Sequence, residues 1–476
     1  MHANYIAGHW VEGDGITRNI NPSDTSDVVG VYTQATLSQV DDAIAAAEAA
    51  APAWGSTTAL QRADMLDAIG TELIARKDEL GRLLAREEGK TLAEATGEAW
   101  RAGTIFRFFA AEAVRLRGDR LPQLRPGVDV DITREPVGVV GLITPWNFPL
   151  AIPAWKIAPA LAFGNTVVLK PAELVPGCAW ALADIISRHG VPPGVFNLTM
   201  GRGTVVGQAI LDDPRVAAIS FTGSAATGKR IAEAAMRRLA KVQMEMGGKN
   251  PLVILDDADL DRAVDCAVQG SFFSTGQRCT ASSRLIVQRG IHDRFVSAMK
   301  TRMDSLRTDN ALLPGTDIGP VVDARQLQQN EDYLRIGRDE GATLVHGGER
   351  LRRDTDGFYF SPALFTDCDN SMRVCREEIF GPVAAVILVD SYEEALAVAN
   401  DTEYGLSAGI CTGSLKHATH FKRQAQVGLV TVNCPTAGAD HHAAFGGRKG
   451  SSYGSREQGT YAAEFYTTVK TAYTAP

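Results

Sequence analysis

The sequence lacks the features that define several protein classes. Its apolar runs are short and broken by glycine or proline, and no basic segment followed by an apolar one opens the chain. We therefore expect neither a membrane span nor a secretory signal. Lysine and arginine number 48 against 56 acidic residues, and the resulting net charge of -8 gives no support for binding nucleic acid.

Cysteine is scarce, and the spacing of the cysteines bears on two classes of protein, disulfide scaffolds and metal-binding proteins. There is no C-x-x-C pair and no spacing with histidine that suits a metal site. The pattern disfavours a disulfide scaffold and a bound metal, and it favours reduced thiols in the cytoplasm. One of the seven thiols could therefore serve as a nucleophile. The seven cysteines are Cys178, Cys266, Cys279, Cys368, Cys375, Cys411 and Cys434.

What the sequence does contain is a long alternation of helical and strand patterns. Its 476 residues predict two or three domains. Residues 38–103 have helical apolar spacing, and an apolar helical stretch at 155–163 separates β-branched runs at 137–143 and 166–170. This is a βαβ unit, and a second alternation covers 259–434. We predict an α/β protein with two doubly wound domains and a cleft between them.

Two further segments predict strands outside these domains. Residues 128–133 alternate apolar and polar side chains, which is typical of an edge strand or hairpin. Residues 464–473 near the end of the chain are rich in β-prone residues. We expect both to extend outward.

A glycine-containing turn at 221–229 follows an apolar strand and opens an amphipathic helix, which we expect over 225–240, so its N–H groups could bind a phosphate. It almost matches a P-loop, but Arg230 stands where the magnesium-binding Ser or Thr belongs, which disfavours a kinase or ATPase. Lys170 and Glu173 follow another strand, where an ammonium and a carboxylate could hold the ribose of NAD. An ordinary glycine turn and solvated charges are the alternatives.

Three other residues fit covalent catalysis. Asn147 lies in the rigid string T-P-W-N-F-P, which suits an amide aimed at an oxyanion. Glu245 follows one methionine and precedes another, and apolar surroundings make a carboxylate hold its proton more tightly, as a general base requires. Cys279 follows Arg278 in a glycine-containing turn, where a cation and helix N-terminal amides would favour the thiolate. A packed turn, an exposed carboxylate and a buried thiol are the alternatives.

Seven strings, in order, resemble the aldehyde dehydrogenase superfamily from about Ile6 to Tyr473. They are P-W-N-F-P, L-K-P-A-E, F-T-G-S, M-E-M-G-G-K-N-P, F-F-S-T-G-Q-R-C, E-E-I-F-G-P-V and F-G-G-R-K-G. The resemblance implies a Rossmann-like NAD(P)-binding domain (1–117 and 137–247), a catalytic domain (248–445) and a β-strand oligomerisation arm (118–136 and 446–476). It also implies a cytoplasmic homodimer or homotetramer that acts on a small aldehyde without a metal.

The resemblance also implies roles for individual residues. Cys279 would be the nucleophile and Glu245 the base, with Lys156 near the proton path. The Asn147 amide and the Cys279 backbone N–H would form the oxyanion hole. The implied NAD or NADP site, with NAD favoured by Glu173, comprises Trp146, Lys170, Glu173, Gly223, Ser224, Glu378 and Phe380.

Residues 274–284 and 443–471 are most similar to the members that oxidise 2,5-dioxopentanoate to 2-oxoglutarate, with succinate semialdehyde or another ω-carboxylated aldehyde as the alternative. A substrate carboxylate needs a cation, and arginine offers a bidentate fork for it. Arg101 and Arg278 are the candidates, although each could equally be a structural ion-pair residue. A P-loop phosphotransferase and a non-catalytic scaffold are the competing functions.

Overall fold

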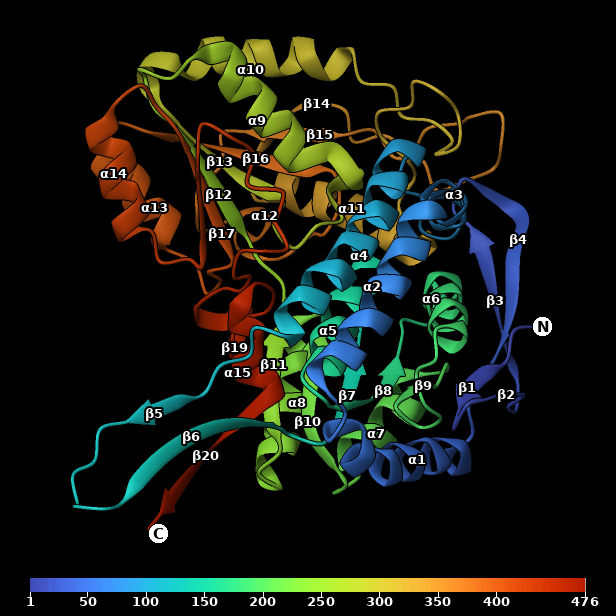
Figure 1. Cartoon of the computed structure of the whole chain (residues 1–476). Helices are drawn as coiled ribbons and strands as arrows, with labels where there is room; N and C mark the ends of the chain where they lie inside the picture. Colours follow the sequence, from blue (N-terminus) through green and yellow to red (C-terminus); the bar gives the residue numbers. More distant parts are fainter. Residues whose placement is uncertain (476) are drawn as a thin grey trace.

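The computed structural model describes residues 1–475 and contains two large sheets with helices on both faces, confirming the predicted α/β class (Figure 1). In the first sheet β11, β10, β7, β8 and β9 run parallel, and the outer strands are antiparallel. Its eight strands in spatial order are β19 (Ser452–Gly454), β11 (Lys241–Glu245), β10 (Val216–Thr222), β7 (Val139–Ile143), β8 (Thr166–Lys170), β9 (Phe196–Leu198), β1 (Asn4–Ile6) and β2 (His9–Val11).

The second large sheet is parallel except for its edge strand β14. Its seven strands in spatial order are β14 (Thr343–His346), β15 (Ala363–Thr366), β16 (Val383–Val389), β13 (Ser282–Gln288), β12 (Asn250–Ile254), β17 (Ser407–Cys411) and β18 (Leu429–Val432). Two small antiparallel sheets complete the fold. They consist of β20 (Thr467–Thr474), β6 (Asp129–Pro136) and β5 (Asp119–Leu121), and of β3 (Ile16–Asn21) and β4 (Asp24–Thr33).

Helices before β12 cover the first sheet, and most of the later ones cover the second. The first group is α1 (Leu37–Gly55), α2 (Ala59–Ala75), α3 (Lys77–Glu88), α4 (Leu92–Ala113), α5 (Ala151–Ala162), α6 (Pro176–Arg188), a π-helical turn η1 (Gly203–Gly207), α7 (Gln208–Asp212) and α8 (Ala225–Arg237). The later group is α9 (Leu260–Phe272), η2 (Phe273–Gly276), α10 (Arg289–Asp304), α11 (Ala324–Asp339), α12 (Arg373–Arg376), α13 (Tyr392–Asn400), α14 (Leu415–Gln424), η3 (Lys449–Ser451), η4 (Thr460–Ala462) and α15 (Ala463–Tyr466).

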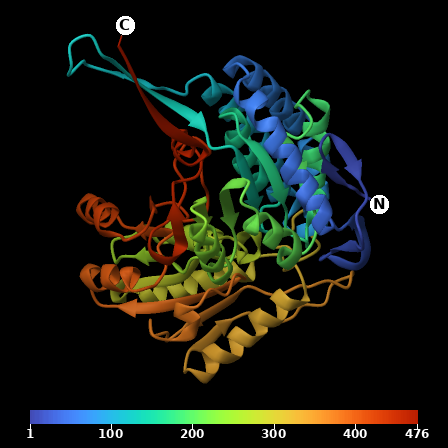
Figure 2. The ribbon, with the colours of Figure 1, turned by 90° about the horizontal axis from the view of Figure 1, so that it is seen from below.

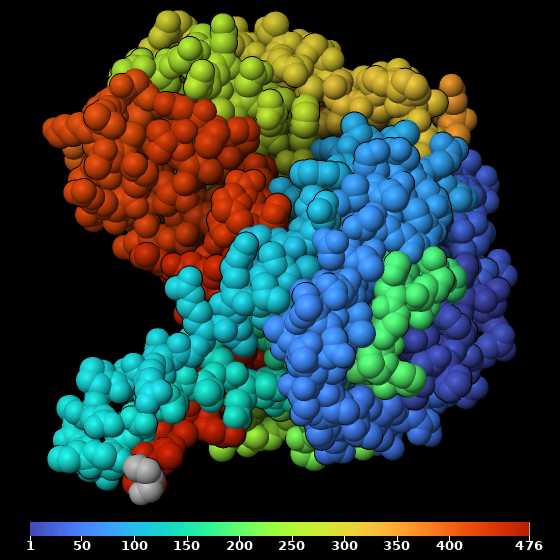
Figure 3. All heavy atoms as spheres, in the orientation of Figure 1, coloured from blue at the N-terminus to red at the C-terminus, as the bar shows by residue number. Residues whose placement is uncertain are grey.

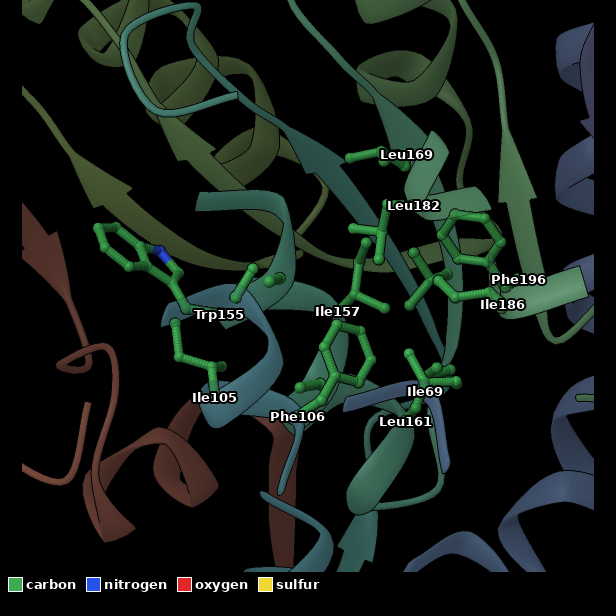
Figure 4. Packing of buried hydrophobic residues seen from close by; sticks show 14 of the residues in the cluster. Ile69, Ile105, Phe106, Trp155, Ile157, Leu161, Leu169, Leu182, Ile186 and Phe196 are labelled. Carbon is green, nitrogen blue, oxygen red and sulfur yellow. The ribbon is translucent and has the colours of Figure 1, made fainter. Parts of the chain in front are cut away.

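Alternate residues of the parallel strands enter different cores, because successive side chains of a strand point to opposite faces. Val140 and Leu142 of β7 pack with helices α2 to α6, whereas Val139 and Ile143 pack with α1, α7 and α8. Figure 4 shows Phe106 of α4 and Ile157 of α5 in the first of these cores. Both faces of the sheet are thereby covered, which is why its strands are apolar throughout.

The second sheet is built in the same way. Leu252 and Ile254 of β12 pack against α9 and α10, while Val253 enters the core with α11, α13 and α14. Both sheets therefore have the doubly wound arrangement, in which ligands bind beyond the carboxyl ends of the strands. Among residues 1–475, the structure has no helix that is both long and apolar enough to cross a membrane.

The three-stranded sheet projects away from the rest of the molecule (Figures 2 and 3). Pairing of β6 with β20 joins two segments that are distant in sequence, from Pro136 with Thr467 to Asp129 with Thr474. We call this sheet the arm. It contains only part of residues 446–476, because β19 pairs with β11 in the eight-stranded sheet.

Two details differ from the sequence-based expectation. The strand predicted over 464–473 begins only at Thr467, because Phe465 and Tyr466 are buried in the first core as part of the short helix α15. The helix expected to continue to residue 240 ends at Arg237, because β11 must begin at Lys241 to pair with β10. Neither difference alters the class of fold.

Candidate active site

A cleft of about 650 Å³ lies where carboxyl ends of β7, β8 and β10 meet segments of the second sheet's half. Val322 and Gln326 at the start of α11 line it from that side. Nine of the residues predicted from sequence to form the site line this cleft, whereas Glu245 and Lys156 lie outside its lining. The nine are Trp146, Asn147, Lys170, Glu173, Gly223, Ser224, Cys279, Glu378 and Phe380.

The turn that carries Cys279 has an unusual backbone. Ser274, Thr275 and Gly276 follow α9 with φ angles of 51°, 56° and 65°, so three consecutive residues are left-handed. This conformation is unfavourable for Ser and Thr and must be held by neighbouring groups. Gly276 is required for a second reason, because a Cβ there would lie 2.3 Å from the Gly381 carbonyl oxygen. We call residues 273–279 the nucleophile turn.

The Cys279 thiol is not predisposed to ionise. Burial and the negative charges of Glu245 and Glu378 raise its pKa to about 12. The expectation of a thiolate favoured by Arg278 is wrong, because the Arg278 Nη2 donates instead to Glu94 Oε1 (2.9 Å) and Ser274 Oγ (2.8 Å). The expected helix N-terminal amides are absent too, since the nucleophile turn follows the end of α9 and leads into β13.

Asn147 lies in the turn after β7 and is 3% exposed. Its Nδ2 donates a hydrogen bond of 2.9 Å to the Gln277 carbonyl, which joins this turn to the nucleophile turn. An amide nitrogen carries two N–H donors, so one remains for a ligand in the cleft. Cys279 is held from its other side, where its carbonyl accepts from Asn250 Nδ2 at 2.8 Å.

Glu245 is the last residue of β11, and it is buried rather than exposed at a turn. Its Oε2 accepts a hydrogen bond of 2.6 Å from Ser452 Oγ. Burial, followed by the negative charge of Glu457, raises the Glu245 pKa well above its usual value. The carboxyl group therefore holds its proton tightly, in the direction that its apolar neighbours predict.

Behind Glu245 is a fully buried pair, Lys156 and Glu457. The Lys156 ammonium donates to the Glu457 carboxylate and, at 2.7 Å, to Ser220 Oγ, which donates in turn to Gln243 Oε1 at 2.9 Å. Glu457 was not found by sequence reasoning. Lys156 and Glu457 are 301 positions apart, and no local pattern around R-E-Q-G connects them. The sequence signal is only that a lysine buried in an apolar helix needs an acidic partner.

One side of the cleft has unoccupied donors suited to an anionic ligand. Ser224 is the N-cap residue of α8, but its hydroxyl donates to Thr227 Oγ1 at 3.1 Å and does not cap the helix. The first N–H groups of α8 are therefore open to a phosphate. Lys170 ends β8 with 6% exposure, and burial lowers its pKa while Glu173 raises it. A ribose hydroxyl could accept from the ammonium and donate to the carboxylate.

The other side of the cleft is formed by Glu378, Phe380 and Trp146. The Phe380 ring packs edge-to-face on Trp146, with centroids 5.3 Å apart, and its backbone φ is 58°. Glu378 Oε1 accepts a hydrogen bond of 3.0 Å from Gly248 N, and burial raises its pKa to about 7. Gly247 permits this arrangement, because a Cβ there would lie 2.1 Å from the Glu378 carboxylate.

The two candidate arginines lie near each other but outside the cleft lining. Arg278 is ion-paired with Glu94. Arg101 is partly buried and forms no ion pair within residues 1–475. Burial and Arg278 lower its pKa, while Glu98 and Asp440 raise it. Of the two, only Arg101 has a guanidinium that is available to a new anion. Among residues 1–475, no group of three or more His, Cys, Asp or Glu side chains is arranged so that it could hold a metal ion.

Comparison with known proteins shows the family of this chain. Residues 10–472 match the aldehyde dehydrogenase family, and the chain belongs to that family. It is 43% identical to the alpha-ketoglutaric semialdehyde dehydrogenase of Bacillus subtilis (strain 168), covering 100% of this chain and 98% of that protein. It is also 43% identical to the alpha-ketoglutarate semialdehyde dehydrogenase of Haloferax volcanii, with 99% and 98% covered.

Among solved structures, betaine aldehyde dehydrogenase from Staphylococcus aureus in complex with NAD+ is similar over its whole fold. The TM-score is 0.97 at 35% sequence identity, and the alignment covers 100% of this chain and 95% of that one.

The buried pair predicts a large loss of stability when one partner is removed. Glu457→Ala leaves the Lys156 ammonium buried without its counter-charge, and we expect the free energy of unfolding to fall by about 3–5 kcal/mol. Denaturant unfolding followed by circular dichroism measures the change. As a control, Glu233→Ala removes the exposed partner of Arg237 and should cost less than about 1 kcal/mol. Equal losses in the two variants would show that Lys156 is not isolated from water.

The charge of Glu245 predicts the pH dependence of the thiol. Because that charge raises the Cys279 pKa, Glu245→Gln should move the midpoint of thiol ionisation to lower pH. The rate of Cys279 alkylation by iodoacetamide, measured against pH by peptide mass spectrometry, reports the midpoint. Alkylation of the unchanged protein should be slow at neutral pH and rise towards high pH. A midpoint that does not move, or moves to higher pH, would show that the charge of Glu245 does not raise the Cys279 pKa.

Proposed function

We propose that this aldehyde dehydrogenase oxidises 2,5-dioxopentanoate, which is α-ketoglutarate semialdehyde, to 2-oxoglutarate with NAD or NADP. The observation that carries the proposal is the convergence of Cys279, Asn147 and Glu245 on one site, in a chain 43% identical to two enzymes named for this substrate. A thiol beside an amide donor and a high-pKa carboxyl group is the constellation that covalent oxidation of an aldehyde requires.

The first step is attack of the Cys279 sulfur on the aldehyde carbon. The carbonyl oxygen becomes an alkoxide, which the free N–H of the Asn147 amide and the Cys279 backbone N–H would stabilise. A donor aimed at such an oxygen contributes roughly 2.7–4 kcal/mol to the transition state. The Cys279 thiol, whose pKa is about 12, must lose its proton as it attacks. That proton would pass to the Glu245 carboxylate and on to solvent, while the two N–H donors stabilise the alkoxide.

The residues of the cleft fit a nicotinamide dinucleotide. The turn of Gly223 and Ser224, with the open N–H groups at the start of α8, would hold its pyrophosphate, and Lys170 with Glu173 would hold the adenosine ribose. Glu378 and Phe380 would contact the nicotinamide half, with Trp146 lining the site beside them. When bound, this cofactor supplies the hydride acceptor that turns the hemithioacetal on Cys279 into a thioester. The carboxylate of Glu173 disfavours a 2′-phosphate and so favours NAD.

Hydrolysis of the thioester requires an activated water. Glu245 is the carboxylate that would accept its proton, and its raised pKa makes it a stronger base than an exposed glutamate. The negative charge of Glu457 raises the pKa of Glu245 and the positive charge of Lys156 lowers it, so the buried pair would set how firmly Glu245 holds its proton. The products are 2-oxoglutarate and the free Cys279 thiol.

Two further features support a binding site for the substrate carboxylate and the formation of an oligomer. Arg101 offers an unpaired guanidinium for the substrate carboxylate, whereas Arg278 is already bound to Glu94 and holds the nucleophile turn. The arm exposes apolar side chains, among them Val469 and Tyr473, which would be covered in a cytoplasmic homodimer or homotetramer.

The sheets also support a division into domains. Residues 1–117 with 137–247 form the NAD(P)-binding domain, 248–445 the catalytic domain, and 118–136 with 446–476 the oligomerisation arm, of which β19 is shared with the first domain.

The covalent mechanism predicts the behaviour of Cys279→Ala. We expect oxidation of 2,5-dioxopentanoate to fall by at least about 10³-fold, because no other group in the cleft can form the thioester. Production of NADH, followed by absorbance, measures the rate, and fluorescence titration with NAD checks that the cofactor site is intact. Cys434→Ala, which changes an exposed cysteine, is the matched control and should leave the rate unchanged. Normal turnover by Cys279→Ala would refute the mechanism.

The substrate assignment predicts a charge-dependent effect at Arg101. Arg101→Met keeps the apolar stem and removes the guanidinium, so kcat/KM for 2,5-dioxopentanoate should fall about 10- to 100-fold. Oxidation of pentanal, which has no carboxylate, should change less than about threefold, because uncharged substrates do not use the cation. Succinate semialdehyde is compared in the same assay to rank the two acids. An equal loss for pentanal would remove Arg101 from the carboxylate site.

A further inference from the structure

The first turns of α4 lie against both turns of the candidate active site. Glu94 and Glu98 are four residues apart on this helix, so their side chains extend from the same face. Neither was singled out by sequence, and neither lines the cleft. Each nevertheless accepts hydrogen bonds from backbone N–H groups of a segment that carries a reactive or oxyanion-binding side chain.

Glu94 holds the nucleophile turn from behind. Its Oε1 accepts hydrogen bonds from Ser274 N (2.8 Å), Ser274 Oγ (3.0 Å) and Arg278 Nη2 (2.9 Å). Its Oε2 accepts from Thr91 Oγ1 at 2.9 Å, which fixes the carboxylate on its own helix. Ser274 is the first of the left-handed residues that precede Cys279. The carboxylate thus stabilises a backbone conformation that serine does not favour by itself.

Glu98 holds the turn that carries Asn147. Its Oε1 accepts from the backbone N–H groups of Leu150 (3.1 Å) and Ala151 (3.0 Å). Its Oε2 accepts at 2.7 Å from Lys90 Nζ, and the same ammonium donates at 2.8 Å to the carbonyl oxygen of Asn147. The Lys90–Glu98 pair, with side chains 1% and 2% exposed, therefore binds the turn at Asn147 and again at Leu150 and Ala151.

The hydrogen bonds of Glu94, Glu98 and Lys90 define the positions of the two turns more than they stabilise the fold. A buried ion pair is often no more stabilising than apolar residues of the same volume, because both charges lose their hydration. What the pair does provide is a defined position for each hydrogen-bond partner. The two turns then meet through the bond from Asn147 Nδ2 to the Gln277 carbonyl, so one helix face sets both partners of that contact.

We propose that Glu94 and Glu98 are positioning residues that set the separation of the Asn147 amide from the Cys279 backbone N–H. This inference rests on the proposed function, in which these two donors form the oxyanion hole. Neither glutamate would touch the substrate. Their effect would appear in kcat, because the donors act on charge that develops in the transition state.

A double-mutant cycle tests the role of Glu98. Glu98→Gln should lower kcat for 2,5-dioxopentanoate about 10- to 100-fold with little change in KM, because the Asn147 amide is misplaced. In an Asn147→Ala background the same change should cost less than about threefold, since the amide that it positions is already gone. A purely structural role would give equal losses in both backgrounds and would overturn the proposal.

A rescue experiment tests Glu94, which is less buried and so more tolerant of change. Glu94→Ala should lower kcat about 10- to 100-fold. Adding Ser274→Gly should recover at least about fivefold, because glycine adopts the left-handed conformation without support. Glu94→Gln, which keeps an acceptor oxygen, should retain more activity than Glu94→Ala. Failure of both variants to recover activity would overturn the role of Glu94.

Controls separate this inference from the proposed function. Glu112→Gln changes a buried glutamate of the same helix that is ion-paired with Arg115, and it should leave kcat unchanged. Thermal unfolding and the alkylation rate of Cys279 show whether each variant is folded with an accessible thiol. If the unchanged protein fails to oxidise 2,5-dioxopentanoate, the proposed function falls. If it is active and Glu94→Ala and Glu98→Gln are equally active, only the positioning role falls.

Discussion

The hydrogen bond from the Asn147 amide to the Gln277 carbonyl is the contact on which the active site depends. It links the turn after β7 of the first sheet to the turn before β13 of the second, across 130 positions of sequence. Other parts of the chain hold the backbones of both turns in place. The hydrogen bond between the turns keeps Asn147 and Cys279 together in the lining of one cleft. The carboxylates of α4 and the Asn250 amide hold these turns from behind.

The electrostatics of the site follow from its burial. Burial raises the pKa of Cys279, Glu245 and Glu378, and the charges of the two glutamates raise the pKa of Cys279 further, so each group holds its proton more firmly than it would in water. Such a site disfavours a free thiolate. Ionisation is instead coupled to the arrival of a carbonyl carbon and to donors that stabilise the resulting oxyanion. The buried Lys156 and Glu457 give Glu245 a charged neighbour of each sign.

Much of the fold was predictable because strand and helix periodicity is local. The βαβ units, the helical segment over 38–103 and the strand at 128–133 all follow from apolar spacing. Several site residues could also be predicted, because the carboxyl ends of parallel strands converge and motifs can be assigned to those ends. What could not be predicted depends on partners distant in sequence. Glu457, Glu94 and Glu98 acquire their places only through tertiary contacts, and Arg278 was misjudged because Glu94 neutralises it.

The central claim is that Cys279 carries the acyl group of the substrate during turnover. Its most direct test is mass spectrometry of protein quenched in acid while it oxidises 2,5-dioxopentanoate with NAD, using Glu245→Gln to slow hydrolysis. The account predicts a peptide in which Cys279 bears a 2-oxoglutaryl thioester. NADH formation without any adduct on Cys279, or an adduct on one of the other six cysteines, would contradict it.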